Sequence, residues 1–421
     1  MEDTDEVRKI IFVGIDWGSE THQTCAMDGA RRIVLEKAVP HSGKGLADLS
    51  AALLRLVNGD VKRLAVAIEV PRGAIVETLL EKQIPVFAIN PKQLDRFRDR
   101  HTVAGAKDDR RDALVLADSL RTDRAAFHPL RLGDPLLVQL RELSRMHDEL
   151  KAERVATGNR LREQLHRYFP QLLELASVYE ARWLWELLEI APVPKQAKKL
   201  ALGKVRSLLK NYRVRSLTPE QVLEKLRSEP LHVADGVTEA CSRHVALLIP
   251  RIRLLHEQQA QVEREIENLL EQLSTAVEGK AEHRDALLLQ SLPGLGKLVC
   301  ATMLAEASEP LEDRDYLRLR SLCGVAPVTK RSGKQYAVRM RAACNQRLRT
   351  AIHHWTTNAI QRDPHWKARY AACRAAGHSH GRALRGIGDR LLATLVALLK
   401  SQTHYDPTRR TVTPGLGIMP A

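Results

Sequence analysis

The chain is poor in cysteine, with six in 421 residues, scattered as Cys25, Cys241, Cys300, Cys323, Cys344 and Cys373. No two of them form the closely spaced pair of a cysteine-rich zinc site, and their spacing does not suit a disulfide framework. Both kinds of cross-link are therefore excluded as the basis of the fold. The pattern suits a reducing cytoplasm.

Long apolar runs are also missing. No run approaches the ~20 residues that a membrane-spanning helix needs. The first six residues are polar and acidic, unlike a secretory signal peptide. We therefore expect a soluble cytoplasmic protein without a membrane partner.

Acidic residues are outnumbered, and two long stretches, 192–218 and 316–362, contain none. The 66 lysines and arginines against 51 acids give a net charge of +15 and a pI near 9.7. This surplus favours a polyanionic partner, with nucleic acid preferred over membrane, although a generally basic soluble protein is the alternative. In the first stretch the candidate phosphate contacts are Lys198, Lys199, Lys204 and Arg206. A solvated basic surface would have the same composition.

Residues 1–130 alternate between strand and helix patterns, which predicts an α/β domain. Three strand-like runs come first, and helices and strands then alternate. The expected strands are 10–16, 22–27, 32–38, 62–69 and 85–89, and the expected helices are 44–57, 73–82 and 107–121. This order predicts a mixed sheet of the ribonuclease-H-like type, in which catalytic acids lie at strand ends.

Four acids stand where such a fold would gather them. Asp16 and Glu69 each end a strand-like run, and Asp109 and Asp112 open a helix three residues apart, on one face. Carboxylates suit Mg²⁺ or Mn²⁺, and two such ions ~4 Å apart assist phosphodiester cleavage. The alternative is structural: an Asp after a strand often forms a turn, and Asp109 or its neighbour Asp108 would cap the helix.

The rest of the chain reads as mainly helical. Residues 131–285 carry leucines at helical spacing, which predicts a coiled-coil hairpin that joins subunits or, equally, a plain bundle within one subunit. Residues 286–400 form a compact helical segment, and 401–421 look like a flexible tail. Pro293-Gly294-Leu295-Gly296, followed by Lys297, is either a turn whose amides approach a phosphate or a simple helix connection.

A Ser-Gly pair, Ser332-Gly333, lies in the second acid-free stretch. The basic residues around it are Lys330, Arg331, Lys334, Arg339, Arg341, Arg347 and Arg349. A serine in this field could attack phosphorus, with the cations stabilising the developing charge. Taken alone, a Ser-Gly pair is usually a turn.

Together these motifs resemble the DEDD transposases of bacterial insertion sequences, a group that includes the Piv-type DNA invertases. The resemblance rests on Gly14-Ile15-Asp16, Ile68-Glu69, the segment 106–113, Leu292–Gly296 and Gly324–Pro327 with Ser332-Gly333. Two departures stand out. Asp108 replaces the threonine common before the third acid, and Cys344 replaces a frequent glycine.

The resemblance implies a RuvC-like nuclease domain with Asp16, Glu69, Asp109 and Asp112 as its metal-binding tetrad. It implies a C-terminal transposase domain in which Ser332 forms a transient phosphoserine link to DNA. Donor and target DNA, a non-coding bridge RNA as guide, and a homodimer or homotetramer with shared active sites are the implied partners. The expected function is a site-specific DNA recombinase of a bacterial insertion sequence. The alternatives are a Holliday-junction-resolving nuclease that uses only the acids and a non-catalytic nucleic-acid-binding protein.

Overall fold

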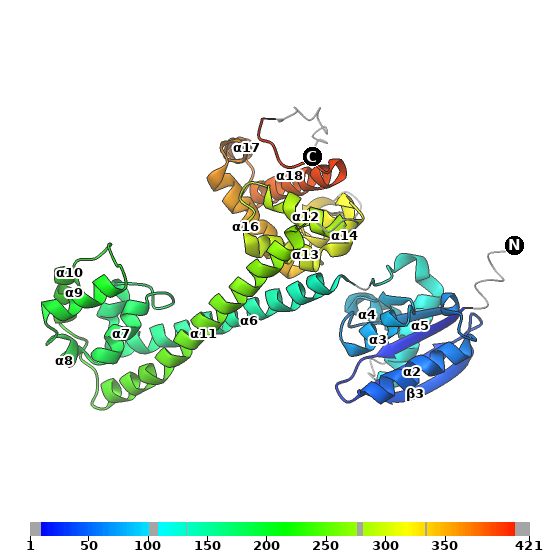
Figure 1. Cartoon of the computed structure of the whole chain (residues 1–421), viewed down its shortest axis with the longest axis horizontal. Coiled ribbons are helices and arrows are strands. Elements are labelled where there is room, and N and C mark those ends of the chain that lie inside the picture. The colour runs from blue at the N-terminus through cyan, green and yellow to red at the C-terminus, as the bar shows by residue number, and fades with distance from the viewer. Residues whose placement is uncertain (1–9, 101–107, 132, 276–280, 333–334, 409–421) are drawn as a thin grey trace. The chain divides into compact units, whose positions relative to one another are not determined.

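The chain falls into two compact units, residues 1–133 and 134–421, in the computed structural model (Figure 1). The structure describes residues 10–100, 108–131, 133–275, 281–332 and 335–408; the side chains of 92, 281–284, 330, 332, 335 and 336 are left out. In the part that it describes, no helix is both long and apolar enough to cross a membrane.

The first unit is built on a five-stranded sheet with the order β3-β2-β1-β4-β5. Its strands are β1 (Ile11–Asp16), β2 (Thr21–Met27), β3 (Ile33–Pro40), β4 (Leu64–Ile68) and β5 (Val86–Ala88). β1 pairs antiparallel with β2 and parallel with β4. The mixed sheet expected from the sequence is confirmed, and its helices match the ribonuclease-H-like reading.

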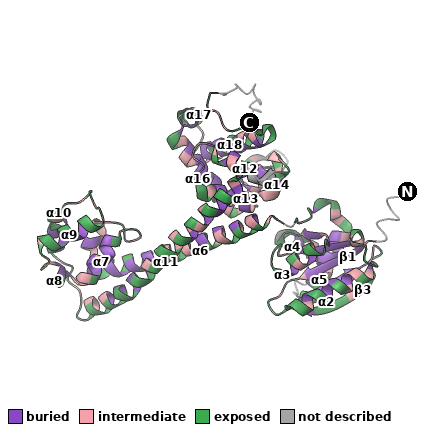
Figure 2. Ribbon diagram, in the orientation of Figure 1, coloured by how far each residue is buried: buried purple, intermediate pink, exposed green. Residues whose placement is uncertain are grey.

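Helices cover both faces of this sheet, because successive strand residues point to opposite sides. They are α2 (Gly43–Leu56), α3 (Ala74–Glu81), α4 (Pro91–Asp99) and α5 (Asp109–Asp123), with a short 3-10 turn at Val61–Arg63 and another at Arg124–Ala126. Val13 and Ile15 pack with α2 and α3, whereas Phe12 packs with α4 and α5. The central strands β1 and β4 are buried between the two layers, whereas the edge strand β3 is mostly exposed (Figure 2). The helix α4 had no counterpart among the expected elements.

A glycine lets α5 lie directly on β1. A Cβ built at Gly14 would meet the carbonyl oxygen of Ala113 at 1.9 Å and the amide nitrogen of Ala117 at 2.5 Å. Only a residue without a side chain allows this approach. The contact fixes the start of α5 over the carboxyl end of β1.

Two long helices form the spine of the second unit, and they lie side by side in Figure 1. They are α6 (Pro135–Tyr168) and α11 (Val237–Ser274). Leu140, near the start of α6, shares a core with Leu269, near the end of α11. Leu165 shares a different core with Ile249. The helices therefore run antiparallel within one chain.

A small helical cluster fills the connection between these long helices. It consists of a 3-10 turn at Pro170–Glu174 and of α7 (Arg182–Ile190), α8 (Pro194–Ala197), α9 (Leu202–Asn211) and α10 (Pro219–Arg227). Trp185, Leu208 and Val222 are buried in its core. A capping box between Thr218 and Gln221 starts α10.

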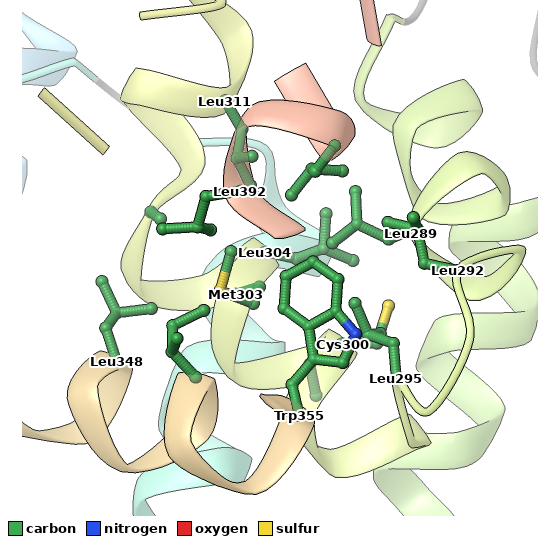
Figure 3. Close-up of a cluster of buried hydrophobic side chains, with 14 of the residues drawn as sticks. Leu289, Leu292, Leu295, Cys300, Met303, Leu304, Leu311, Leu348, Trp355 and Leu392 are labelled. Atoms are coloured by element: carbon green, nitrogen blue, oxygen red, sulfur yellow. The ribbon is translucent and has the colours of Figure 1, made fainter. Parts of the chain in front are cut away.

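The remaining helices pack around the other end of α6 and α11. They are α12 (Ala281–Gln290), α13 (Lys297–Glu306), α14 (Ser308–Glu312), α15 (Tyr316–Leu322), α16 (Gln346–Arg362), α17 (Pro364–Ala375) and α18 (His380–Ser401). Their core includes Met303, Trp355 and Leu392 (Figure 3). Leu137 of α6 belongs to the same core. No gap in packing therefore separates the expected regions 131–285 and 286–400.

The turn at Pro293–Gly296 joins α12 to α13 as a packing element. The indole nitrogen of Trp355 donates to the Pro293 carbonyl oxygen at 3.0 Å. Gly294 has a φ of +74°, and a Cβ there would lie 2.4 Å from the Ala359 amide nitrogen. These contacts favour the helix connection over a phosphate-binding turn for Gly294.

A two-stranded hairpin interrupts this helical region. β6 (Val328–Ser332) pairs antiparallel with β7 (Gln335–Arg339). The sequence predicted only a turn here, because five-residue strands rich in cations carry little apolar alternation.

In the expected tail, the Tyr405 amide donates to Ser291 Oγ at 3.0 Å. The tail residues 409–421 lie outside the described part.

The spine of the second unit contains a buried histidine that makes its stability depend on pH. His147 Nε2 lies 2.9 Å from Glu263 Oε1, and Nδ1 lies 3.7 Å from Asp148 Oδ1. The two carboxylates, Asp148 at ion-pair distance and Glu263 at hydrogen-bond distance, raise the pKa of His147 against burial. A histidine whose pKa is raised in the folded state stabilises the fold fully at pH values below the ordinary imidazole pKa. This contribution is lost as the pH rises through the folded-state pKa.

Replacing His147 with Gln should therefore flatten the pH dependence of stability. The melting temperature of the wild type minus that of H147Q should be larger at about pH 6 than at about pH 8.5. Differential scanning fluorimetry measures both. An equal difference at the two pH values would contradict the role of His147 charge.

Candidate active site

Asp16 and Glu69 stand at the ends of two neighbouring parallel strands, on the same side of the sheet. Gly14 and Ala67 are paired in the register of β1 and β4, and both face α5. Asp16 lies two residues beyond Gly14, and Glu69 two residues beyond Ala67, so the alternation of strand side chains places both acids on the α5 side. The carboxyl ends of the two strands meet at one edge of the sheet. Both acids are partly exposed there.

Asp109 and Asp112 come from the first turn of α5. Asp108 is the N-cap residue, and its side chain accepts from the Arg110 amide at 3.3 Å. The helix-capping role that the sequence suggested for Asp109 or Asp108 therefore belongs to Asp108. Asp109 precedes Ala113 by one helical turn, and Ala113 packs on the sheet, so both carboxylates of the pair lie toward the sheet edge.

The four acids are brought to one corner of the first unit, but they do not form a compact ligand cluster. Among the described residues, no three or more His, Cys, Asp or Glu side chains are close enough to hold a metal ion together. Asp112 is 1 % exposed, and its Oδ1 accepts from Arg98 Nε at 2.8 Å. A guanidinium of α4 thus neutralises one acid of the set.

Arg98 cannot be recognised as a site residue from the sequence, because its importance depends on where α4 lies. It also donates to Asp95, an exposed residue one turn earlier, at 2.8 Å. The hydrogen bonds and charges of Asp112 and Asp95 raise the pKa of Arg98 against the effect of burial. The only signal in the sequence was two arginines in the last turn of a short polar segment.

A pair of histidines lies beside the loop that follows Asp16. His22 Nε2 lies 2.9 Å from His41 Nδ1, and His22 Nδ1 accepts from the Gly18 amide at 3.3 Å. Burial, with the His41 charge, lowers the pKa of His22. The ring is therefore neutral at neutral pH and adds no cation to this corner.

Ser332 lies in the second unit, as the last residue of β6. Its backbone is paired with Gln335 across the hairpin, while its side chain lies outside the described part. Lys330 is described only in its backbone, and Lys334 lies outside the described residues. Arg331 and Arg339 of the same hairpin are exposed. The serine therefore sits at the end of a basic hairpin.

Some of the basic residues proposed to bind nucleic acid are held by internal contacts instead. The three nitrogens of the Arg347 guanidinium donate to Asp148 Oδ2 at 2.8 Å, Glu306 Oε1 at 2.5 Å and Ser144 Oγ at 2.6 Å. Arg347 therefore ties α16 to α6 and α13. Arg349 donates to the carbonyl oxygen of Arg341.

Other candidates face solvent. Lys199 and Lys204 are exposed, and Lys198 is partly exposed, on or beside α8 and α9. Arg206 lies 3.6 Å from Glu220, and both are more than half exposed, so solvent weakens this pair. Lys297 lies 2.9 Å from Glu267 in a similar exposed pair. These cations remain accessible to a phosphate backbone.

Comparison with known proteins assigns the family. A family model described as "Transposase" matches residues 13–170, and one described as "Transposase IS116/IS110/IS902 family" matches residues 286–371. The mini-circle putative transposase for IS117 of Streptomyces coelicolor is 31 % identical over 413 residues, which are 95 % of this chain and 96 % of that protein. The chain belongs to the IS110 family of transposases.

Two further relatives agree. The putative transposase y4uE of Sinorhizobium fredii is 48 % identical over 207 residues, which are 48 % of this chain and 57 % of that protein. An uncharacterized 43.6 kDa protein of insertion element IS110, from Streptomyces coelicolor, is 26 % identical over 417 residues, 96 % of this chain and 97 % of its own length. The IS110-family chain is thus an enzyme that acts on DNA, and the DEDD type of its N-terminal model implies a divalent metal. The acids lie within the first match and Ser332 within the second.

The Arg98–Asp112 pair predicts a strong local effect on stability. Arg98→Ala leaves a buried carboxylate without its cation, and we expect a loss of about 3 kcal/mol in the opening free energy of α5. Hydrogen exchange of the α5 amides measures it. Asp95→Ala removes only the exposed partner and should cost less than about 1 kcal/mol. Similar losses in the two variants would contradict the assignment.

Proposed function

We propose that this transposase cuts and rejoins DNA through a transient phosphodiester between Ser332 and a DNA strand, assisted by a divalent metal at the four acids. The observation that carries the proposal is the placement of Asp16, Glu69, Asp109 and Asp112. Two neighbouring strand ends and one helix start direct them to the same corner of the first unit.

The four carboxylates have the chemistry of a site for Mg²⁺ or Mn²⁺, because hard oxygen donors are what these ions prefer. When bound, the metal would supply Lewis-acid stabilisation of charge at the scissile phosphate. Arg98 provides positive charge at Asp112 and competes with any cation there. Arg98 Nε would be displaced from Asp112 by a metal, while Arg98 Nη1 could keep its bond to Asp95.

The serine step balances without an external energy source. The Ser332 oxygen attacks phosphorus, a bond from serine oxygen to phosphorus forms, and the phosphorus bond to one strand end breaks. The proton of the serine hydroxyl is removed, and the departing strand end is protonated as a free hydroxyl. Rejoining reverses these events, with a strand hydroxyl attacking the phosphoserine. The exposed Arg331, which precedes the serine in β6, stabilises the charge that develops on the phosphoryl oxygens, whereas Arg339 lies at the other end of the hairpin, opposite Val328.

The partners follow from the family and from the basic surface. Donor and target DNA are proposed as substrates, with a bridge RNA pairing to both as guide. The exposed cations of α8 and α9 are placed to hold a phosphate backbone. A homodimer or homotetramer would combine the acids of one subunit with the serine of another.

A nuclease that uses only the acids is the rival that one observation favours. The acids come from two strand ends of a five-stranded sheet and from the helix packed on it, whereas the serine stands on a two-stranded hairpin. This rival cleaves with water and forms no covalent adduct. The serine variant therefore separates the two functions.

Ser332→Ala should abolish the SDS-resistant protein–DNA adduct that the wild type forms with DNA carrying the element's own ends and Mg²⁺. The cause is loss of the attacking oxygen, and gel electrophoresis of labelled DNA measures the adduct. Ser321→Ala, in α15 of the same acid-free stretch, is the matched control and should form adduct normally. An adduct that survives in S332A would sink the serine assignment.

Asp109→Asn should reduce metal-dependent strand cleavage by at least about a hundredfold, since removing a key charge-stabilising group typically costs this much. Asp108→Asn should leave cleavage near the wild-type rate, because asparagine also caps a helix. Both variants replace an aspartate with asparagine, at adjacent positions of the chain. Equal loss in both variants would place the effect in the helix start rather than in metal binding.

RNA that accompanies the purified protein tests the guide. We expect sequencing to return one discrete structured transcript, retained through washing at moderate salt. Lys199→Glu with Lys204→Glu should lower its yield. Random cellular RNA in proportion to its abundance would argue against a guide.

A further inference from the structure

A cavity of about 310 Å³ lies between α16 and α18. Its walls come from one face of α16, from the first turn and a half of α18, and from the turn at Cys323–Val325. Its size is at the lower end of the range for small-molecule pockets, roughly 300–1,000 Å³. Every wall belongs to the second unit.

The rim of this cavity is basic. Arg349, His353, His380 and Arg385 line it, and no acidic residue does. Arg385 Nη1 lies 3.8 Å from Met340 Sδ across the mouth, which sets a guanidinium beside a thioether. Flat guanidinium groups stack on bases, and a thioether packs well on aromatic rings. The rim thus suits an anionic ligand with a flat aromatic part.

The interior is apolar, with one hydroxyl that lacks a partner. Val325, Ile352 and Leu384 supply the apolar wall. Thr356 is 1 % exposed, and its Oγ1 has no hydrogen-bond partner among the described residues. Buried hydroxyls are normally paired, and an unpaired one costs about 1–3 kcal/mol. Thr356 lines the cavity, and its hydroxyl lies in the wall toward Gly388 of α18.

The cavity lies at the base of the hairpin that carries Ser332. Met340 follows the last residue of β7, and Val325 precedes the first residue of β6 by three positions. Four residue steps of strand separate Val328 from Ser332, so the base of the hairpin, next to the cavity, stands roughly 13 Å from the hairpin end. A DNA strand held near Ser332 would therefore pass the cavity within a few nucleotides of the serine.

We propose that this cavity receives one unstacked base of the DNA strand that lies along the hairpin. Met340 and Arg385 flank the base, and the Thr356 side chain in the cavity wall meets its edge. Taking a base out of the stack costs a few kcal/mol, so a shaped receiving pocket is what makes the conformation stable. The inference rests on the proposed function only in taking DNA as the bound strand.

Binding measured without cleavage tests it, so its failure is separate from failure of the serine chemistry. The probe is a fluorescein-labelled single-stranded DNA 12-mer of mixed sequence, compared with an abasic 12-mer of equal charge. An RNA 12-mer of the same sequence is the third probe. Fluorescence anisotropy gives Kd for each with the full-length protein.

The wild type should bind the base-containing DNA about tenfold more tightly than the abasic strand, the scale of one well-held base. Leu384→Trp fills the cavity and should remove most of this preference, while the affinity for the abasic strand stays. Thr356→Val deletes one hydroxyl, keeps the shape, and should lower the preference roughly fivefold. If L384W does not fold, the T356V result alone tests whether the cavity receives a base.

Two matched controls come from the same helices. Thr357→Val removes a hydroxyl that already donates to the His353 carbonyl oxygen at 2.9 Å, and it should keep the full preference. Arg385→Ala should weaken the preference, whereas Arg382→Ala, an exposed arginine of α18 that does not line the cavity, should not. An unchanged preference in both L384W and T356V overturns the proposal. So does a cavity-dependent preference shown by the RNA but not by the DNA.

Discussion

The close packing of α5 on β1 is the constraint on which the candidate active site depends. At Gly14 the helix backbone comes so near the strand that no side chain fits between them. This contact sets the height of α5 above the sheet and hence the position of its first turn. Because β1 and β4 are parallel and in register, their ends meet beneath that turn. The four acids thereby share a corner although Asp16 and Asp112 are far apart in the chain.

Charge in this protein serves two purposes that composition cannot separate. Arg347 joins three helices by three hydrogen bonds, and Arg98 neutralises a buried carboxylate. Arg320 is likewise bound by Asp389 of α18 at 2.9 Å. The surface available to DNA is therefore smaller than a net charge of +15 suggests. Exposed cations on and beside α8 and α9 and in the hairpin of β6 and β7 are part of that surface.

Much of the fold was predictable from periodicity, and the exceptions have physical causes. The buried strands and α5 carry clear apolar patterns, so their existence and order followed from the residues. The helix α4 has a polar sequence and is held by Leu94 and by the ion pairs of Arg98. The hairpin that carries Ser332 depends on backbone pairing rather than on apolar alternation. Neither α4 nor the hairpin can be predicted from the apolar pattern of a single sequence.

The sequence by itself determined the kinds of residues at the site, the mixed sheet, the long helical hairpin and the family resemblance that comparison confirmed. Each of these depends on local pattern or on motif order. Only the tertiary structure decided that Asp108 caps a helix, that Arg98 holds Asp112, and that a cavity with an unpaired Thr356 hydroxyl lies at the base of the hairpin. These are contacts between residues distant in the chain or choices between adjacent identical side chains. Their outcome depends on burial and geometry, which no local pattern encodes.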